Sequence, residues 1–189
     1  LTLFATLTVI SYYLDMEKKL FFGYGANRNR SKIRQVIGRD PGEGVGAILE
    51  GYSLYLQDME QIPERVRADL QKIFGNSFKS YTIVKGKGFV LGVIWAITDE
   101  ELEKIKVWEY VGEWREIIEV TVKSEDFYTV KVLTEKCIDT FPATKKVDGL
   151  YYNELELKEL EITKEEDEFY TKKQLEEIRK LLARHNSEI

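Results

Sequence analysis

The sequence is poor in the side chains that most hydrolases and metalloenzymes use. Its 189 residues include one cysteine, Cys137, and one histidine, His185. A single cysteine excludes an intrachain disulfide, which fits a reducing compartment, so we expect a cytoplasmic protein. Zinc sites, Ser-His-Asp triads and Cys-His pairs need more of these residues, so we expect chemistry without a metal or cofactor. Carboxylates, hydroxyls and backbone amides remain as chemical groups.

The sequence also has no excess of positively charged residues. Lys and Arg number 28 against 33 Asp and Glu, which gives a net charge of −5. This balance argues against a surface for nucleic acid or anionic membrane. The apolar run 1–14 is too short to span a membrane and lacks the basic residues that open a signal peptide. We therefore expect neither a nucleic-acid nor a membrane partner, and a monomer or homodimer.

The length favours one domain with an adequate hydrophobic core. We expect that domain to span 16–189, because a clear strand pattern begins soon after Met16. Residues 1–15 are treated as an N-terminal extension, either a translated upstream stretch or an extra element packed on the domain. No internal repeat or low-complexity linker divides the chain.

Apolar periodicity and turn residues predict an alternating order of strands and helices. The predicted strands span 20–23, 47–56, 81–84, 89–97, 114–122 and 127–133. The predicted helices span 31–37, 63–74 and 98–108, with a last helix beginning at Thr171. Glycines and polar residues at 85–88 and 123–126 predict two hairpins. This order indicates an α+β fold, with a mixed, strongly curled, small barrel-like sheet and flanking helices.

The glycine-containing loop 23–27 follows a predicted buried strand and precedes a predicted helix. Glycines let backbone N–H groups approach a ligand closely, and N–H groups at a helix entrance favour an anionic oxygen. The loop could therefore hold a carboxylate or the oxyanion of a carbonyl under attack. Taken alone, it is better explained as a tight turn without a ligand. Arg28 occupies the third glycine position of a dinucleotide loop, which argues against dinucleotide binding.

Glu109 is the carboxylate that the sequence singles out. It lies three to four residues beyond Ile105 on the helix face that carries Leu102. An apolar setting on that face would disfavour the charged carboxylate and suit it to proton transfer. By itself the pattern is also explained by a solvent-facing residue at a helix end, or by an ion pair with Arg115.

Other candidate residues have weaker support. Glu113 and Glu116 stand near Glu109, but a turn and the following strand give them no comparable reason to face inward. We expect His185 to be a surface residue and Cys137 to be structural rather than a nucleophile.

Together these features resemble the γ-glutamyl cyclotransferase family, whose relatives include γ-glutamylamine cyclotransferases and AIG2-like proteins. The family pattern is a strand into Tyr-Gly-Ser-Asn, a Gly-Tyr strand, a Gly-Val-hydrophobic strand, and Leu-Asp-x-x-Glu-Gly followed by an aromatic residue. It is matched, in order, at 20–27, 51–54, 92–97 and 105–110, with Trp114 as the aromatic residue. The resemblance covers about 20–133.

Several positions depart from the family pattern. Ala26 replaces the usual serine, so the loop is expected to act through backbone N–H groups rather than a hydroxyl. Lys106 and Tyr110 replace the aspartate and glycine around the glutamate, and Trp114 stands where a tyrosine is common. The sequence after Pro142 does not match the family clearly.

The resemblance implies that the α-amine of a γ-glutamyl amine or peptide attacks its own γ-carbonyl, forming 5-oxoproline and releasing the amine. It implies that Glu109 is the catalytic general acid and base. It implies a substrate site made by Gly23, Tyr24, Gly25, Ala26, Asn27 and Trp114. The nucleophile belongs to the substrate, so no metal or cofactor is needed.

Two other functional hypotheses remain open from the sequence alone. The first is a non-catalytic relative that binds a small acidic metabolite or a protein partner, since fold does not fix function. The second is a different amide or ester reaction that uses the same carboxylate.

Overall fold

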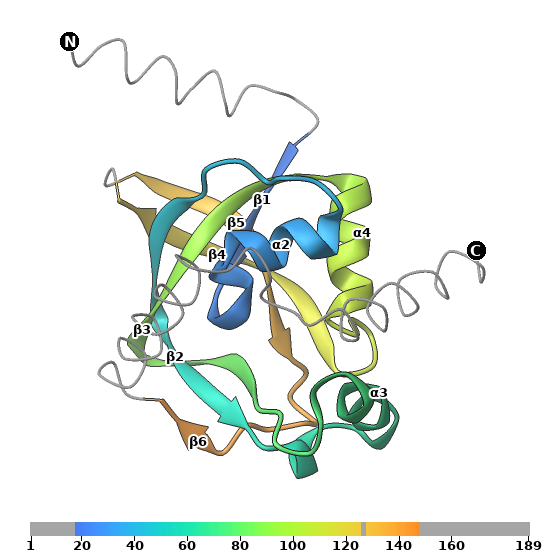
Figure 1. The fold of residues 1–189 in the computed structure, drawn as a ribbon. Coiled ribbons are helices and arrows are strands. Elements are labelled where there is room, and N and C mark those ends of the chain that lie inside the picture. The colour runs from blue at the N-terminus through green and yellow to red at the C-terminus, as the bar shows by residue number, and fades with distance from the viewer. Residues whose placement is uncertain (1–17, 126–127, 148–189) are drawn as a thin grey trace, which may run out of the picture.

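The computed structural model describes residues 18–125 and 128–147 (Figure 1). The expectations for residues 1–15, for the helix beginning at Thr171 and for His185 lie outside this part of the chain. Across the described ranges, no helix has the length and apolar character needed to cross a membrane.

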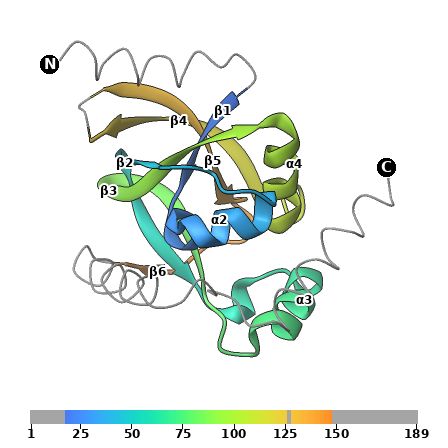
Figure 2. The ribbon, with the colours of Figure 1, turned by 45° about the horizontal axis from the view of Figure 1, so that its top comes forward.

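Six strands form one mixed sheet. They are β1 (Lys18–Gly23), β2 (Val45–Gln57), β3 (Ser80–Thr98), β4 (Arg115–Ser124), β5 (Thr129–Cys137) and β6 (Lys145–Lys146). Their order is β3-β1-β5-β4-β2-β6, and β3 also pairs with β2, so the first five strands close into a barrel (Figures 1 and 2). β1 and β5 are parallel, and the other neighbours are antiparallel. The α+β class and the curled, barrel-like sheet are confirmed.

The hairpin predicted at 85–88 is wrong, because β3 runs through these residues as one long strand. Its partner β2 contains a β-bulge where Gly51 has a φ of +77°. A Cβ atom on Gly88 would lie 2.4 Å from the Ser53 hydroxyl oxygen and 2.8 Å from the Tyr52 carbonyl oxygen. Glycine at this position therefore allows two strands to approach closely at a bulge, and it does not mark a chain reversal.

The three predicted helices of the described part are present. They are α2 (Arg30–Ile37), α3 (Glu64–Phe74) and α4 (Asp99–Trp108), with 3₁₀ turns η1 (Gly25–Arg28) and η2 (Met59–Gln61). A capping box begins α4: the Thr98 hydroxyl oxygen accepts from the Glu101 N–H at 3.3 Å, and the Glu101 carboxylate accepts from the Thr98 N–H at 2.8 Å. Helices α2 and α4 lie together against the barrel, and α3 lies near one end (Figures 1 and 2).

The core has three parts. One fills the barrel and includes Phe22 and Tyr24. A second lies between the barrel and helices α2 and α4, and includes Trp108. A third lies beneath α3 and includes Leu70 and Trp114. Residues from all three parts line a single cavity, so this cavity occupies the border where the three clusters meet.

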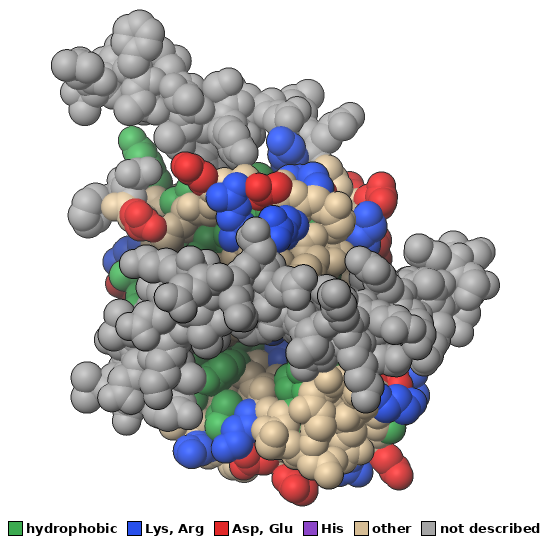
Figure 3. All heavy atoms as spheres, viewed as in Figure 1, with side chains coloured by type: hydrophobic (Ala, Val, Ile, Leu, Met, Phe, Trp, Pro, Cys, Tyr) green, Lys and Arg blue, Asp and Glu red, His purple; other side chains and the backbone are tan. Residues whose placement is uncertain are grey.

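Charged side chains of both signs are interspersed on the parts of the surface visible in Figure 3 outside the grey atoms. Several form ion pairs, such as Arg30 with Asp40 at 2.6 Å and Lys19 with Asp99 at 2.5 Å. Exposed pairs of this kind contribute at most about 1 kcal/mol each, so the buried charges described below matter more for the fold.

Candidate active site

The cavity has a volume of about 270 Å³. Most of the residues predicted to form the site line it: Tyr24, Ala26, Asn27, Glu109 and Trp114. The two loop glycines, at 23 and 25, are not among its lining residues. The structure thus brings the loop after β1 and the end of α4 to the same cavity, although they are far apart in the sequence.

The two glycines shape the loop instead. A Cβ atom on Gly23 would lie 2.2 Å from the carbonyl oxygen of Asn27. Gly25 has a φ of +55°, in the left-handed region that favours glycine. The N–H of Asn27 donates to the carbonyl oxygen of Tyr24 at 3.1 Å, which closes the 3₁₀ turn. The backbone N–H of Asn27 is therefore already engaged, and this residue reaches the cavity through its side chain.

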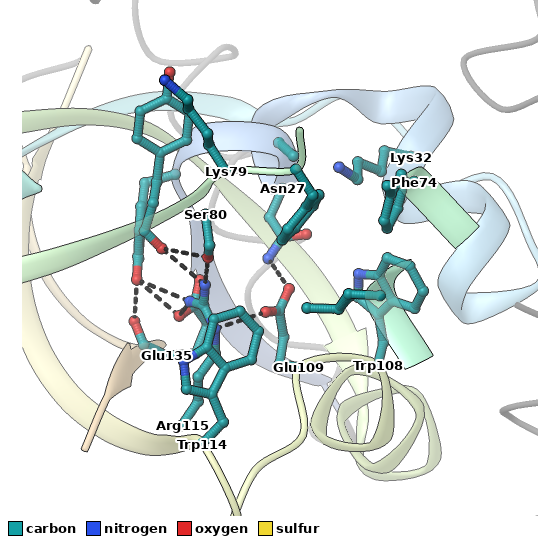
Figure 4. Close-up of a pocket in the computed structure, with 15 residues that line it drawn as sticks. Asn27, Lys32, Phe74, Lys79, Ser80, Trp108, Glu109, Trp114, Arg115 and Glu135 are labelled. Carbon is teal, nitrogen blue, oxygen red and sulfur yellow. Dashed lines mark hydrogen bonds and ion pairs between the residues drawn. The ribbon is translucent and has the colours of Figure 1, made fainter. Parts of the chain in front are cut away.

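Glu109 caps the C-terminal end of α4 and points into the cavity (Figure 4). Its side chain is 10% exposed. One carboxylate oxygen accepts a hydrogen bond from the Asn27 side-chain amide at 2.7 Å, and the other lies 3.3 Å from Arg115 Nε. The sequence predicted an inward-facing residue in apolar surroundings, with an ion pair to Arg115 as one alternative. The residue faces inward, but its surroundings are polar: the Asn27 amide and the Arg115 cation hold the carboxylate in a fixed position.

Arg115, the first residue of β4, was expected from the sequence only as an alternative ion-pair partner of Glu109, and the structure places it at the centre of a buried charge network. Its guanidinium donates to the Glu135 carboxylate, to the Ser80 hydroxyl and, at 2.8 Å, to the Tyr81 carbonyl oxygen. Burial alone would lower the pKa of Arg115, but the neighbouring carboxylates of Glu135 and Glu109 help to raise it well above its usual value. A permanent cation thus lies between two buried carboxylates.

Glu135 on β5 is the second carboxylate of the cavity. The hydroxyl oxygen of Tyr24 lies 2.7 Å from the Glu135 side chain and 2.7 Å from its carbonyl oxygen. Burial raises the pKa of Glu135 to about 7, because the nearby Arg115 offsets the effect of burial only in part. Burial, together with the charge of Glu135, also raises the pKa of Tyr24 well above its usual value, so this phenol stays neutral. A signal for Glu135 was present in the sequence, since Leu133 and Cys137 share its strand parity.

Trp114 holds Arg115 from the other side. Its ring centroid lies 4.5 Å from the guanidinium carbon, a cation–π contact. Its indole N–H donates to the Gln57 side-chain oxygen at 3.0 Å, and the Cys137 thiol donates to the same oxygen at 3.1 Å. Burial raises the pKa of Cys137, which disfavours a thiolate. The cysteine therefore has a structural environment, as the sequence predicted.

The competing carboxylates lie elsewhere. Glu113 pairs with Arg65 at the surface, and Glu116 pairs with Lys136 at 2.8 Å. Among residues 18–125 and 128–147, no group of three or more His, Cys, Asp or Glu side chains is arranged to hold a metal ion.

Tyr110 explains one departure from the family pattern. It has a φ of +52°, so it adopts the left-handed conformation at the position where the family has glycine. Its ring is buried in the cluster beneath α3, and its hydroxyl lies 3.5 Å from Asp69. Tyr110 is not among the residues that line the cavity, so replacing glycine has not filled the site.

A scan against models of known protein families found no match, and a search of curated proteins found none either. Solved structures do match. A γ-glutamyl cyclotransferase is 22% identical, with 89% of this chain and 99% of that chain covered and a TM-score of 0.55. An Arabidopsis thaliana protein is 20% identical over 77% of this chain and 79% of that chain, with a TM-score of 0.55. An uncharacterized Homo sapiens protein is 22% identical over 88% of this chain and 99% of that chain, with a TM-score of 0.52. Likeness at these identities establishes the fold, and this chain has the fold of γ-glutamyl cyclotransferase.

Proposed function

We propose that this protein is an enzyme of the γ-glutamyl cyclotransferase type. It would cyclise a γ-glutamyl amine or peptide to 5-oxoproline and release the amine. The observation that carries this proposal is the contact between Asn27 and Glu109, 2.7 Å apart inside the cavity. It brings together the loop and the carboxylate that the resemblance assigns to the reaction.

The reaction needs one proton acceptor that later becomes a donor. The α-amine nitrogen of the substrate attacks its γ-carbonyl carbon, and a proton from that amine passes to Glu109. The bond from the carbonyl carbon to the leaving nitrogen then breaks, and Glu109 returns the proton to that nitrogen. A carboxylate has about four lone-pair sites, so the contacts with Asn27 and Arg115 leave room for the proton.

The rest of the cavity supports this chemistry by positioning. Holding the amine and the carbonyl in a reactive geometry can supply about 7–11 kcal/mol of the barrier. The first N–H groups of a 3₁₀ turn have no partner within it. Of the residues at the start of η1, Ala26 lines the cavity, so its N–H group is the backbone donor proposed for the developing oxyanion. Ala26 is sufficient for this role, because a backbone donor needs no side-chain hydroxyl.

The proposal is tested by incubating the protein with a panel of γ-glutamyl compounds and measuring 5-oxoproline. Glu109→Gln should keep the fold, as it is nearly isosteric, while kcat falls by roughly 100-fold or more. Glu113→Gln is the matched control, since this carboxylate faces Arg65 at the surface, and it should keep wild-type turnover. Wild-type turnover in Glu109→Gln would remove Glu109 from the mechanism.

The same panel separates catalysis from binding. A compound that binds in the cavity but yields no 5-oxoproline would assign the protein to the non-catalytic relatives. Calorimetric titration with each compound, followed by product analysis of the same sample, distinguishes the two outcomes.

A further inference from the structure

The cavity is asymmetric about Glu109, and this asymmetry bears on the leaving amine. Figure 4 shows Arg115 and Glu135 on one side of Glu109, and Trp108 and Phe74 on the other. The first side is filled by hydrogen-bonded polar groups that engage one another. A γ-carbonyl placed at Glu109 would therefore direct its leaving group towards the aromatic side.

Three aromatic rings build the wall of that side. Phe74, the last residue of α3, stacks on Phe78 with ring centroids 4.8 Å apart and an interplanar angle of 22°. Trp108 meets Phe74 edge to face, with centroids 6.2 Å apart and an angle of 71°. All three line the cavity together with Leu70. A wall of this kind favours a flat or large apolar group, through both buried area and ring geometry.

A lysine lies on the same side. Lys32 of α2 is 8% exposed, lines the cavity, and is drawn on the same side of Glu109 as Phe74 in Figure 4. An ammonium has three N–H donors, so Lys32 can bind a ligand carboxylate in addition to its contacts within the protein. Lys79 also lines the cavity, but its ammonium lies 3.8 Å from the Asp58 carboxylate, so Lys32 is the lysine on which the charge argument rests. A positively charged leaving group would be repelled here, whereas a carboxylate would be attracted.

We propose, resting on the function above, that the preferred leaving group is an amino acid or peptide with an aromatic or large apolar side chain and a free carboxylate. Its side chain packs on Phe74 and Trp108, and its carboxylate binds Lys32. Simple amines and cationic amines are poorer leaving groups in this site, because they lack the anion or carry the opposite charge.

Three compounds test this inference. γ-Glutamyl-phenylalanine has both features, γ-glutamyl-phenethylamine lacks the carboxylate, and γ-glutamyl-alanine lacks the ring. We expect kcat/KM for the phenylalanine compound to exceed that of each of the others by roughly 10-fold or more. This comparison uses the wild-type protein and does not depend on the folding of any variant.

Two variants then assign the preference to residues. Lys32→Met should lower kcat/KM for γ-glutamyl-phenylalanine by about 10-fold and leave γ-glutamyl-phenethylamine nearly unchanged. Phe74→Ala should reduce the preference for phenylalanine over alanine. Lys131→Met is the matched control, because this lysine pairs with Glu119 at an exposed position on β5, and it should keep both preferences.

The outcomes separate this inference from the function on which it rests. Turnover of all three compounds at similar rates would overturn the inference and leave the cyclotransferase activity standing. An equal loss on both phenyl compounds in Lys32→Met would also overturn it, because Lys32 would then hold the glutamyl part. Absence of 5-oxoproline from these three compounds would overturn the inference, and its absence from the whole panel of γ-glutamyl compounds would overturn the cyclotransferase proposal as well.

Discussion

Replacement of Arg115 by methionine is the most direct test of the buried charge network. The variant keeps an apolar stem of similar length but removes the guanidinium between two buried carboxylates. Glu135 is 2% exposed and Glu109 is 8% exposed, so neither can recover its hydration without opening the structure. Breaking a buried ion pair by removing one partner costs about 3–5 kcal/mol. Since domains are stable by about 5–15 kcal/mol, the variant should lose a large part of its free energy of unfolding.

The loss should depend on pH in a defined direction. Arg115 lowers the pKa of Glu135, so its removal raises that pKa further above the usual value. The folded variant then binds more protons than the unfolded chain at pH values above the usual carboxyl range. Under this condition the free energy of unfolding falls as the pH rises. The destabilisation of Arg115→Met should therefore be larger at pH 8 than at pH 5.

Urea denaturation followed by far-UV circular dichroism at the two pH values measures both effects. Adding Glu135→Gln to Arg115→Met should restore part of the stability, because one uncompensated carboxylate is removed. Arg65→Met is the control, since Arg65 pairs with Glu113 at the surface, and it should cost less than about 1 kcal/mol. A free energy of unfolding for Arg115→Met within about 1 kcal/mol of wild type at pH 8 would contradict a buried ion pair, whose loss should cost several times more. An equal loss of free energy of unfolding at pH 5 and pH 8 would contradict the role given to Glu135.

Three smaller perturbations probe other parts of the structure. The raised pKa of Glu135 stabilises the fold below its ordinary value of 4.5, and this contribution is lost as the pH rises through about 7. In urea titrations, the free energy of unfolding of wild type relative to Glu135→Gln should therefore fall as the pH rises through this range. A difference that does not change with pH would contradict the raised pKa of Glu135. Gly92→Ala places a Cβ atom 2.4 Å from the Phe22 ring and should cost about 1–3 kcal/mol in thermal melts. Gly86→Ala, whose nearest neighbour would lie 3.5 Å away, should cost clearly less. Thr98→Ala should lower the free energy of unfolding by about 1 kcal/mol, because the N-cap of α4 is lost. An unchanged melting temperature would refute the capping role of Thr98.

Local signals in the sequence were sufficient to predict helix α4 and to predict that the side chain of Glu109 faces inward. The capping box at Thr98 fixes where the helix begins, because its two hydrogen bonds join residues three positions apart. The spacing from Ile105 to Glu109 then places the carboxylate on the inner face. Neither inference needs knowledge of a distant residue, which explains why both agree with the structure.

At 85–88, where a hairpin was wrongly predicted, the structure depends on a distant part of the chain rather than on a local signal. Glycine is favoured both in tight turns and where two backbones approach closely, and the sequence alone does not separate the two. What decides here is the bulge at Gly51 on the facing strand, more than thirty positions earlier. The partner strand was predicted, but its register was not.

The charge network was missed for a related reason. Charged residues on strands usually face solvent, so the burial of Arg115 and Glu135 was not predicted, although Arg115 was named as an alternative ion-pair partner of Glu109 and Glu135 has apolar neighbours on its strand face. Their burial depends on the closed ring of strands, which brings β4 and β5 against the side chain of Tyr24. For the same reason, the sequence predicted apolar surroundings for Glu109, whereas the structure gives it polar ones.

The closed barrel also has a consequence for how the protein acquires its site during folding. Tyr24 and Glu135 are 111 positions apart in the chain, and Asn27 and Glu109 are 82 apart. Contacts of such high sequence separation form slowly, because the intervening chain must lose its freedom first. The parallel pairing of β1 with β5 joins the two ends of the barrel sequence. Recovery of ligand binding after dilution from urea should therefore lag behind recovery of helical signal, and would time the closure of the barrel.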